Sequence, residues 1–359
     1  MIAEQTAGMA PLALHEFHHA RGARFSTQNG FEAVASYGST EAEYIALTRE
    51  AGLTDLSFRS RICLLGADRE KFLHGQITND IARLKVGEGT YGALVTAKGK
   101  LETDLFAYKL QDELLLDFEA GLTQKITERL SRYIIAEDVQ IVDVAPHYSL
   151  LSIQGPRAAA MITNSGIIET LPENALNWTR TASASGDLYV MSNGRYGTAG
   201  YDLFVPIADT ASVAEKLSGF IKPIGLEACE ISRIENGIPR FGVDMDATNL
   251  APEALSENAI SYAKGCYIGQ EVIARIRTYG QVAKALRLLR LPAELQQLPQ
   301  RTEKFFKNGK EVGFITSATL SPKHGGKIAL GYVRKEANAP GDSLNLGAVD
   351  GPPAVIISA

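Results

Sequence analysis

The sequence contains few cysteines and no long apolar run. Its three cysteines, Cys63, Cys229 and Cys266, are widely spaced along 359 residues. Neither a disulfide framework nor a CxxC zinc pattern can be written from them, so we expect a reducing compartment. No stretch approaches the ~18 uninterrupted apolar residues that a membrane helix needs. The first 25 residues lack a basic start followed by an apolar run. We therefore expect no secretory signal there, and a cytoplasmic location.

Several functional signatures are also missing. The chain has no G-x-S-x-G elbow, no Walker loop and no Rossmann fingerprint. His15, His18 and His19 lie close together, but no nearby aspartate or cysteine completes a ligand set, so no metal site is expected. The net charge of −5 argues against nucleic-acid binding by the field of the whole molecule. Neither nucleic acid nor a membrane is an expected direct partner.

The composition is that of a globular protein. Hydrophobic residues make up 45% and charged residues 21% of the chain, a balance that allows a substantial core. The length predicts two or three domains. An early helix is expected after Ser39, which can cap it, and Gly52 falls just beyond its end, where a C-terminal cap favours glycine.

Two successive α+β units are predicted from the hydrophobic pattern. The first consists of a strand at 61–66, a helix at 68–80, strands at 91–96, 101–110 and 113–118, a helix at 121–133 and a strand at 139–144. A similar unit follows, with strands at 149–154, 188–192 and 201–205 and helices from 156 and at 211–220. We therefore expect two α+β halves without a fixed sequence period.

The segment after residue 284 has a different pattern. Short strands are predicted at 286–291, 305–307, 312–318, 327–333 and 354–357, separated by Pro, Gly and Asn turns. So many short strands in so short a segment predict a small barrel or sandwich. The domain boundary is placed near residue 283, with no low-complexity linker.

The most informative stretch is Lys264-Gly265-Cys266-Tyr267-Ile268-Gly269-Gln270-Glu271, just before an expected helix. A cysteine near a helix N-terminus, with a lysine two residues away, is favoured as thiolate. Glu271 and Arg275 are four residues apart and can pair on one helix face. Six basic residues and one acid lie between 264 and 290, which would suit an anionic ligand tail or a phosphate-bearing partner. The alternative is that the cysteine is an apolar filler and the charges form a solvated face.

The string KGCYIGQE, followed by Arg275, resembles the signature of the YgfZ family. The residues that carry this resemblance are Lys264, Gly265, Cys266, Tyr267, Gly269, Gln270, Glu271 and Arg275. Members of that family resemble folate-binding aminomethyltransferases in fold. They are implicated in assembly or repair of iron–sulfur clusters and, through it, in tRNA modification. The resemblance implies iron–sulfur proteins or cluster-assembly proteins as partners, and a functional role for the Cys266 thiol.

Other segments are similar to the glycine-cleavage aminomethyltransferase, so the resemblance covers nearly the whole chain. They are LHEFHHARGARF (14–25), TDLS (54–57), TND (78–80), IQGP (153–156), SRIENGIPRFGVDM (232–245), VGFITSATLSP (312–322) and KIALGYV (327–333). The resemblance implies an α+β fold of the three-part cloverleaf type, with two folate-binding modules, a C-terminal β-barrel and a central channel. The corresponding domains are 1–283, with 53–141 as an inserted module, and 284–359.

The expected cofactor is tetrahydrofolate or a one-carbon derivative. Glu235 matches a pterin-contacting glutamate of the superfamily, and one carboxylate can accept the two adjacent N–H donors of a pterin edge. The alternative is an exposed glutamate paired with Arg233 or Arg240. Tyr91 is a candidate aromatic wall for the ligand. Tyr201 and Arg233 complete the expected cofactor-binding set.

Asp104 is a candidate catalytic acid with an uncertain match. Aminomethyltransferases carry an acidic pair after a double-glycine turn, whereas this chain has Gly99-Lys100-Leu101-Glu102-Thr103-Asp104. One acid of the pair is therefore Thr103, and either acid of the family pattern could correspond to Asp104. If the lost acid is the catalytic one, aminomethyl transfer is impaired while folate binding survives.

A second departure affects the turn at 196–202. Aminomethyltransferases have YTGExGYE there, and this chain has YGTAGYD, one residue shorter and without the internal glutamate. Three functions remain open: a folate-binding factor for iron–sulfur proteins, a tetrahydrofolate-dependent aminomethyl- or methyltransferase, and a non-catalytic folate-binding scaffold.

Overall fold

The structure is a computed structural model and describes residues 10–280 and 282–357. It divides into two compact units, which are treated separately. Unit 1 comprises the described residues up to His74 together with Asp80–Tyr91 and Leu105–Glu230. Unit 2 comprises Gly75–Asn79, Gly92–Asp104 and the described residues from Ile231 onward.

The first α+β module follows the predicted order. Its elements are β4 (Ser60–Leu65), α3 (Arg69–His74), β5 (Gly89–Val95), β6 (Leu101–Lys109), β7 (Leu114–Phe118), α4 (Thr123–Ser131) and β8 (Gln140–Asp143). The strands form one sheet in the order β5-β6-β7-β4-β8. All five residues of β7 are buried, which explains its uninterrupted apolar sequence apart from Asp117.

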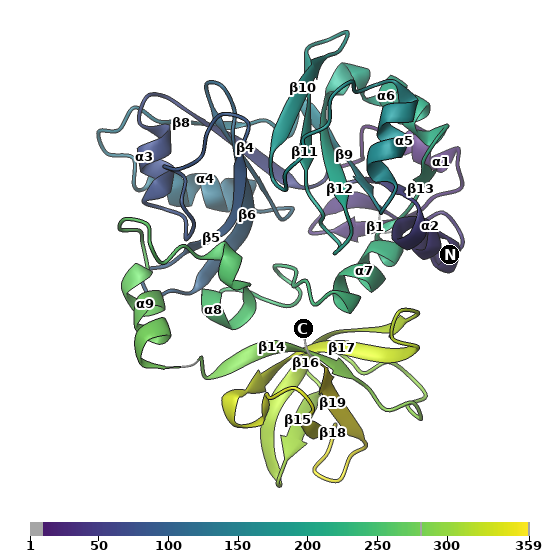
Figure 1. Cartoon of the computed structure of the whole chain (residues 1–359), viewed down its shortest axis with the longest axis vertical. Helices are drawn as coiled ribbons and strands as arrows, with labels where there is room; N and C mark the ends of the chain where they lie inside the picture. Colours follow the sequence, from purple (N-terminus) through teal and green to yellow (C-terminus); the bar gives the residue numbers. More distant parts are fainter. Residues whose placement is uncertain (1–9, 281, 358–359) are drawn as a thin grey trace. The chain divides into compact units, whose positions relative to one another are not determined.

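The second module repeats this sequence of elements. It consists of β9 (Tyr148–Gln154), α5 (Ala158–Ser165), β10 (Trp178–Ala182), β11 (Asp187–Ser192), β12 (Gly200–Pro206), α6 (Thr210–Ser218) and β13 (Lys222–Pro223). Its sheet has the order β10-β11-β12-β9-β3-β13. Here β9 and β13 correspond to β4 and β8 of the first module, and the additional strand β3 (Gly52–Asp55) lies between them. The two halves thus share one topology, and the predicted recurrence is confirmed (Figure 1).

Two helical predictions need correction. Ser39 caps α2 (Thr40–Arg49) by accepting a hydrogen bond from the Ala42 amide, as expected. Gly52, however, is the first residue of β3 and not a helix cap. A Cβ there would lie 2.4 Å from the Ile224 side chain, so close packing is the reason for glycine.

The predicted helix at 68–80 is also too long. It ends at His74, and the following residues of unit 2 pair with a neighbouring strand: Ile77 forms a bridge with Leu94. The Thr78 amide donates to the Ala93 carbonyl at 3.0 Å. Tertiary pairing therefore overrides the helical periodicity of this segment.

The all-β segment is a closed barrel. Its strands are β14 (Lys284–Arg290), β15 (Lys304–Lys307), β16 (Lys310–Ser321), β17 (Gly326–Arg334), β18 (Ser343–Leu346) and β19 (Pro353–Ile357). They close in the order β14-β17-β16-β15-β18-β19 around a core that includes Phe305, Ile315 and Ile356 (Figure 1). Closure leaves no free sheet edge. The predicted architecture of two α+β modules and a small β-barrel is confirmed. Of the two alternatives predicted for the C-terminal segment, a barrel or a sandwich, the structure shows the barrel.

Some described elements were not predicted. They include α1 (His15–His19), the two-stranded sheet of β1 (Arg24–Gln28) and β2 (Phe31–Ser36), the helices α7 (Leu226–Glu235) and α8 (Ala251–Ala254), and the strands β3, β10, β13 and β18. The expected helix after Gly269 is present as α9 (Gln270–Tyr279).

Candidate functional site

The loop 264–271 is held to unit 2 by a buried lysine. The ammonium of Lys264 donates hydrogen bonds to the carbonyl oxygens of Ile77 and Asn79, each at 2.8 Å. It also lies 5.0 Å from the centre of the Tyr267 ring. A buried ammonium needs such partners, because water no longer solvates it. Lys264 therefore anchors the loop.

Backbone contacts fix the remainder of the loop. The Ile268 amide donates to the Gly75 carbonyl at 3.1 Å. Gly269 has a φ of +82°, and a Cβ there would lie 2.5 Å from the Thr96 carbonyl oxygen. Only glycine accommodates both this left-handed conformation and this close approach.

Cys266 is exposed although it lies between two buried residues, Lys264 and Tyr267. The other two cysteines are buried, and burial raises the pKa of both the Cys63 and the Cys229 thiol. All three cysteines are free and fall within the described residues. The accessible thiol is thus Cys266. The Lys264 ammonium, which the sequence places two residues from this thiol, donates to backbone carbonyls, and its predicted influence on the thiol stays a prediction.

The predicted pair on α9 is confirmed. The Arg275 guanidinium donates to the Glu271 carboxylate at 3.1 Å, and both side chains are mostly exposed. Such a surface pair contributes little to stability.

Glu235 ends α7 and is buried. Its Oε1 accepts hydrogen bonds from the Ser321 hydroxyl and, at 3.0 Å, from the Lys323 amide. The carboxylate therefore connects α7 to the end of β16 within unit 2. Its predicted contact with a pterin remains a prediction.

Arg233 lies two residues earlier in α7 and is also buried. Its guanidinium donates to Asp244 at 2.7 Å and to the Ser317 hydroxyl at 3.1 Å. The hydroxyl of Thr316 donates to the other oxygen of Asp244 at 2.6 Å. A buried, paired guanidinium of this kind has a structural role in the unit, and its predicted role in cofactor binding stays a prediction.

Burial alternates along β6, so that Thr103 lies on one face of the strand and the acidic residues Glu102 and Asp104 lie on the other. Thr103 is fully buried, whereas Glu102 and Asp104 are half-buried and therefore share the opposite face of the strand. Phe106 lies on the same face as these two acids, and its ring packs 5.0 Å from that of Tyr91 within unit 1. Tyr201 is half-buried on β12, where it packs against the apolar core of the second module.

Several buried polar residues were not identified from sequence. Asp117 and Asp202 both bind the Arg195 guanidinium, and Arg59 donates to Asp117 at 2.8 Å. The sequence contained only an indirect indication of these residues. Arg195 directly precedes the turn at 196–202, which differs from the aminomethyltransferase pattern, and Asp202 is the last residue of that turn.

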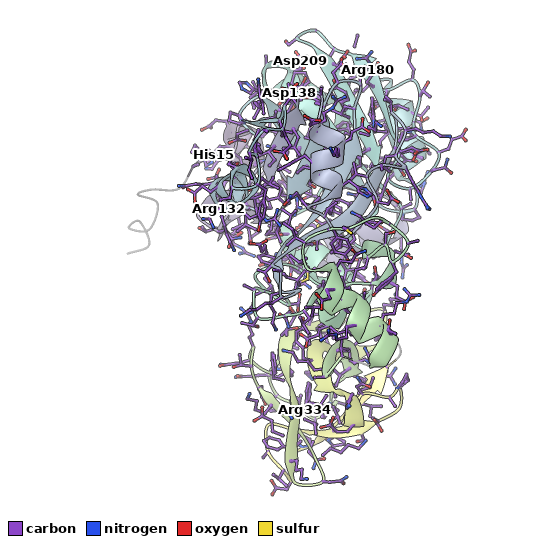
Figure 2. The ribbon with its side chains drawn as sticks, turned by 90° about the vertical axis from the view of Figure 1, so that its left-hand side faces the viewer. His15, Arg132, Asp138, Arg180, Asp209 and Arg334 are labelled. Carbon is purple, nitrogen blue, oxygen red and sulfur yellow. The ribbon has the colours of Figure 1, made fainter. Side chains whose placement is uncertain are left out.

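The N-terminal histidines have partners other than a metal. His15, labelled in Figure 2, lies 2.9 Å from Glu32, while His18 contacts Asp55 and the Tyr37 hydroxyl. Within residues 10–280 and 282–357, no group of three His, Cys, Asp or Glu side chains is arranged to hold a metal ion. Nor does any helix of that range have the length and apolar content needed to cross a bilayer.

Comparison with known proteins places the chain in a family. Residues 14–264 match the GCVT N-terminal domain, and residues 284–356 match the glycine cleavage T-protein C-terminal barrel domain. Because the first match alone covers more than half of the chain, this protein belongs to the glycine cleavage T-protein family, whose members include aminomethyltransferases.

Individual relatives match over almost their whole length. The aminomethyltransferase of Rubrobacter xylanophilus is 28% identical, with 94% of this chain and 90% of the relative covered. That of Listeria monocytogenes serotype 4b is 26% identical, with 93% and 92% covered. The crystal structure of glycine cleavage system aminomethyltransferase T from Bartonella henselae matches with a TM-score of 0.86. It is 24% identical, with 98% of this chain and 97% of that chain covered, and it supports the fold alone.

Proposed function

We propose that this protein binds tetrahydrofolate, or a one-carbon derivative, and acts as a YgfZ-type factor in the assembly or repair of iron–sulfur clusters. Through that activity it would support tRNA modification by cluster-dependent enzymes. The partners in this proposal are iron–sulfur proteins or cluster-assembly proteins, and the compartment is the cytoplasm. The proposed domains are 1–283 and 284–359, with 53–141 as the inserted module.

The exposed thiol of Cys266 on an anchored loop is the observation that carries this proposal. Lys264, Ile268 and Gly269 hold the loop through buried or closely packed contacts, while Cys266 faces solvent. Cysteine sulfur is the usual protein ligand of iron–sulfur clusters. A rigidly presented thiol is therefore suited to contact a partner protein or its cluster.

Folate binding is proposed from the family and from Glu235, Arg233, Tyr91 and Tyr201. Glu235 already accepts hydrogen bonds from Ser321 and Lys323. A carboxylate has about four lone-pair positions, so contact with a pterin edge would use those that remain. Ser321 would then hold the carboxylate in place for the ligand.

A second candidate function is tetrahydrofolate-dependent aminomethyl transfer. The names of the relatives favour this candidate over the first. The half-buried position of Asp104, on the same face of β6 as Glu102, also supports it, because a carboxylate there is not sequestered in the core. Asp104 would be the catalytic acid or base.

One assay separates the two candidates. The purified protein is supplied with an aminomethylated lipoyl carrier, and tetrahydrofolate-dependent release of ammonia is measured for the wild type, Asp104→Asn and Glu102→Gln. Glu102 is the matched control, because it shares the strand face. Turnover that Asp104→Asn abolishes and Glu102→Gln retains would establish the transferase. Absence of turnover, together with a loss of cluster-enzyme activity in cells carrying Cys266→Ala, would support the maintenance factor.

Folate binding is tested separately by titration calorimetry. Glu235→Ala should weaken tetrahydrofolate binding by about 1.5–3 kcal/mol, the usual cost of a lost charged hydrogen bond. Ser321→Ala is the control that disturbs the support of Glu235 while keeping the carboxylate. Equal affinities for the wild type and Glu235→Ala would show that the glutamate serves only to join α7 to the barrel.

A further inference from the structure

Four asparagine–glycine pairs occur in the sequence, at 29–30, 193–194, 236–237 and 308–309. Asparagine followed by glycine is the pair most prone to deamidation, because a glycine without Cβ leaves its nitrogen free to attack the side-chain amide of the asparagine. The local sequence does not separate the four pairs, since glycine is the second residue in each. Only the folded environment can therefore select one of them for modification.

Hydrogen bonds hold three of the four asparagine side chains. The amide groups donate from Asn29 to the Ala120 carbonyl at 3.0 Å, from Asn193 to the Asp202 carboxylate at 2.9 Å and from Asn236 to the Ser232 carbonyl at 2.8 Å. Asn193 is also buried, and the side-chain oxygen of Asn236 accepts from Lys323 at 2.8 Å. Each amide must break these contacts before its carbon can approach the next backbone nitrogen.

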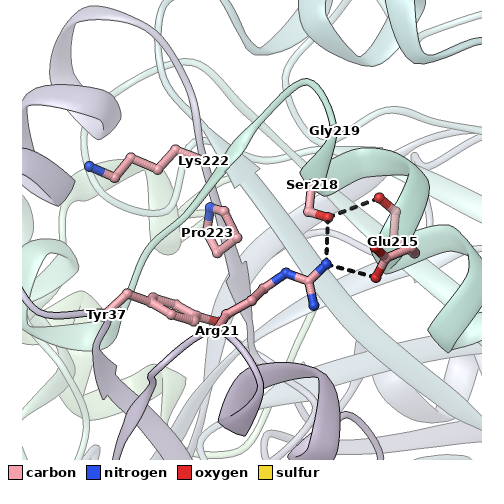
Figure 3. Close-up of a pocket in the computed structure, with 7 residues that line it drawn as sticks. All are labelled: Arg21, Tyr37, Glu215, Ser218, Gly219, Lys222 and Pro223. Carbon is pink, nitrogen blue, oxygen red and sulfur yellow. Dashed lines mark hydrogen bonds and ion pairs between the residues drawn. The ribbon is translucent and has the colours of Figure 1, made fainter.

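A position near the surface does not by itself free a side chain, because neighbouring residues can still hold it. Arg21, at the wall of the surface pocket in Figure 3, donates to Glu215 at 2.7 Å and to the Ser218 hydroxyl at 3.4 Å. Asn29 and Asn236 are likewise exposed, yet their amides are bonded. Exposure alone therefore does not decide which asparagine can react.

Asn308 is both exposed and unrestrained. Among the residues that the structure describes, none forms a hydrogen bond or ion pair with its side chain, and none accepts from the Gly309 amide. A Cβ at Gly309 would meet no atom within 4 Å, so water and hydroxide can reach the turn. Both reacting groups are free at this pair.

The pair also forms the two-residue turn between β15 and β16. Asn308 and Gly309 have φ values of +53° and +76°, as in the type I′ turn that asparagine–glycine pairs favour. The turn joins Lys307 and Lys310, which are register partners in the sheet. Phe305 of the same strand is fully buried in the barrel core. The backbone of this turn therefore sets the register of a strand that packs in the barrel.

We propose that Asn308 is the site at which this protein deamidates in its folded state. The Gly309 backbone nitrogen loses its proton to hydroxide and attacks Cγ of Asn308. The new N–Cγ bond closes a succinimide ring as the Cγ–Nδ2 bond breaks, and Nδ2 leaves as ammonia after taking a proton from water, which regenerates hydroxide. Water then adds to one of the two imide carbonyls, and the imide opens to aspartate or isoaspartate.

The two products affect the barrel differently. Aspartate keeps the backbone unchanged, and aspartate–glycine pairs also favour a type I′ turn. Isoaspartate adds one atom to the backbone of the turn, which disturbs the pairing of Lys307 with Lys310. Conversion to isoaspartate therefore loosens β15, whereas the aspartate product leaves it paired.

Peptide mass spectrometry after incubation of the full chain at mildly alkaline pH tests the selectivity. Asn29 is the matched control: it forms a two-residue turn with Gly30, with φ values of +48° and +88°, between the paired strands β1 and β2. Asn308 should convert from amide to acid about tenfold faster than Asn29, whose amide must first give up one hydrogen bond. In guanidinium chloride, which removes the structure, the rates at the four pairs should become similar.

Three results would overturn the selectivity: no conversion at Asn308, conversion of Asn29 or Asn236 as fast as that of Asn308 in the folded protein, or rate differences that persist in guanidinium chloride. Asn308→Gln should abolish the reaction at this position, because closure would need a larger ring.

Asn308→Asp separates the two products. Amide hydrogen exchange in β15 should match the wild type in Asn308→Asp. It should be about tenfold faster in the isoaspartate form purified after incubation, the effect of about one lost backbone hydrogen bond. Equal exchange in these two proteins would overturn the proposed loosening of β15.

Discussion

Asp117 and Asp202 occupy corresponding strands of the two α+β modules, β7 and β12, and both carboxylates bind the same guanidinium, that of Arg195. All three side chains are buried, the two carboxylates completely. Ser152 donates to Asp202 at 2.7 Å, and Arg59 donates to Asp117 at 2.8 Å. One cation thus joins the two halves of the repeated topology inside unit 1.

The first prediction concerns the stability that depends on this cation. Arg195→Met should lower the free energy of unfolding by about 3–5 kcal/mol, because it leaves buried carboxylates without their partner. Urea denaturation measures the change. Arg180→Met is the control: its pair with Asp187 is exposed, and its loss should cost less than about 1 kcal/mol. Equal effects of the two substitutions would show that the buried charges are not coupled to stability.

The second prediction follows from the titration of Asp117. Burial raises its pKa, but the charges of Arg195 and Arg59 outweigh this effect and hold the pKa below its ordinary value of 3.8. The carboxylate therefore contributes stability above that value and loses the contribution as the pH falls below it. Between roughly pH 4 and pH 2, the wild type should lose stability more steeply than Asp117→Asn. The free energy of unfolding, measured by urea denaturation, is compared at each pH for the two proteins. The same pH dependence in both would show that Asp117 is not the group responsible.

The third prediction tests the anchor of the thiol loop. Lys264→Met should lower the free energy of unfolding by about 1.5–3 kcal/mol, because the buried carbonyl oxygen of Ile77 and the partly buried one of Asn79 lose a charged donor. Amide hydrogen exchange at Tyr267 and Ile268 should accelerate. Lys98→Met, at an exposed position, should change stability by less than about 0.5 kcal/mol. Unchanged exchange in Lys264→Met would mean that the backbone contacts of Ile268 and Gly269 suffice to hold the loop.

The fourth prediction concerns alkaline pH. Burial, and then the neighbouring Tyr262, raise the pKa of Tyr267 to about 12 from an ordinary value of 10.0. The unfolded chain therefore releases this proton first, so stability is complete below pH 10 and declines as the pH rises toward about 12. Over that interval the free energy of unfolding of the wild type should fall more steeply than that of Tyr267→Phe. Tyr133→Phe, at an exposed tyrosine, is the control and should lose stability with rising pH as the wild type does. If stability falls equally steeply in Tyr267→Phe, the loss does not come from Tyr267.

The sequence alone determined the features that depend on neighbouring residues. The strands of the barrel other than β18 follow from short apolar runs between turns, and the Ser39 cap and the Glu271–Arg275 pair follow from spacings of a few residues. Local geometry fixes such contacts, because residues three or four apart in a helix are neighbours whatever the rest of the chain does. The same local pattern identified the loop that displays Cys266.

Only the tertiary structure decided which distant groups meet. Lys264 reaches Ile77 and Asn79 across more than 180 residues, and Arg195 binds Asp117 from 78 residues away. Position 52 requires glycine because the Ile224 side chain packs too closely for a Cβ, not because the preceding helix needs a cap. A buried charge must find a partner because water is excluded from it, but the packing of the folded chain selects that partner, and no sequence spacing records the choice.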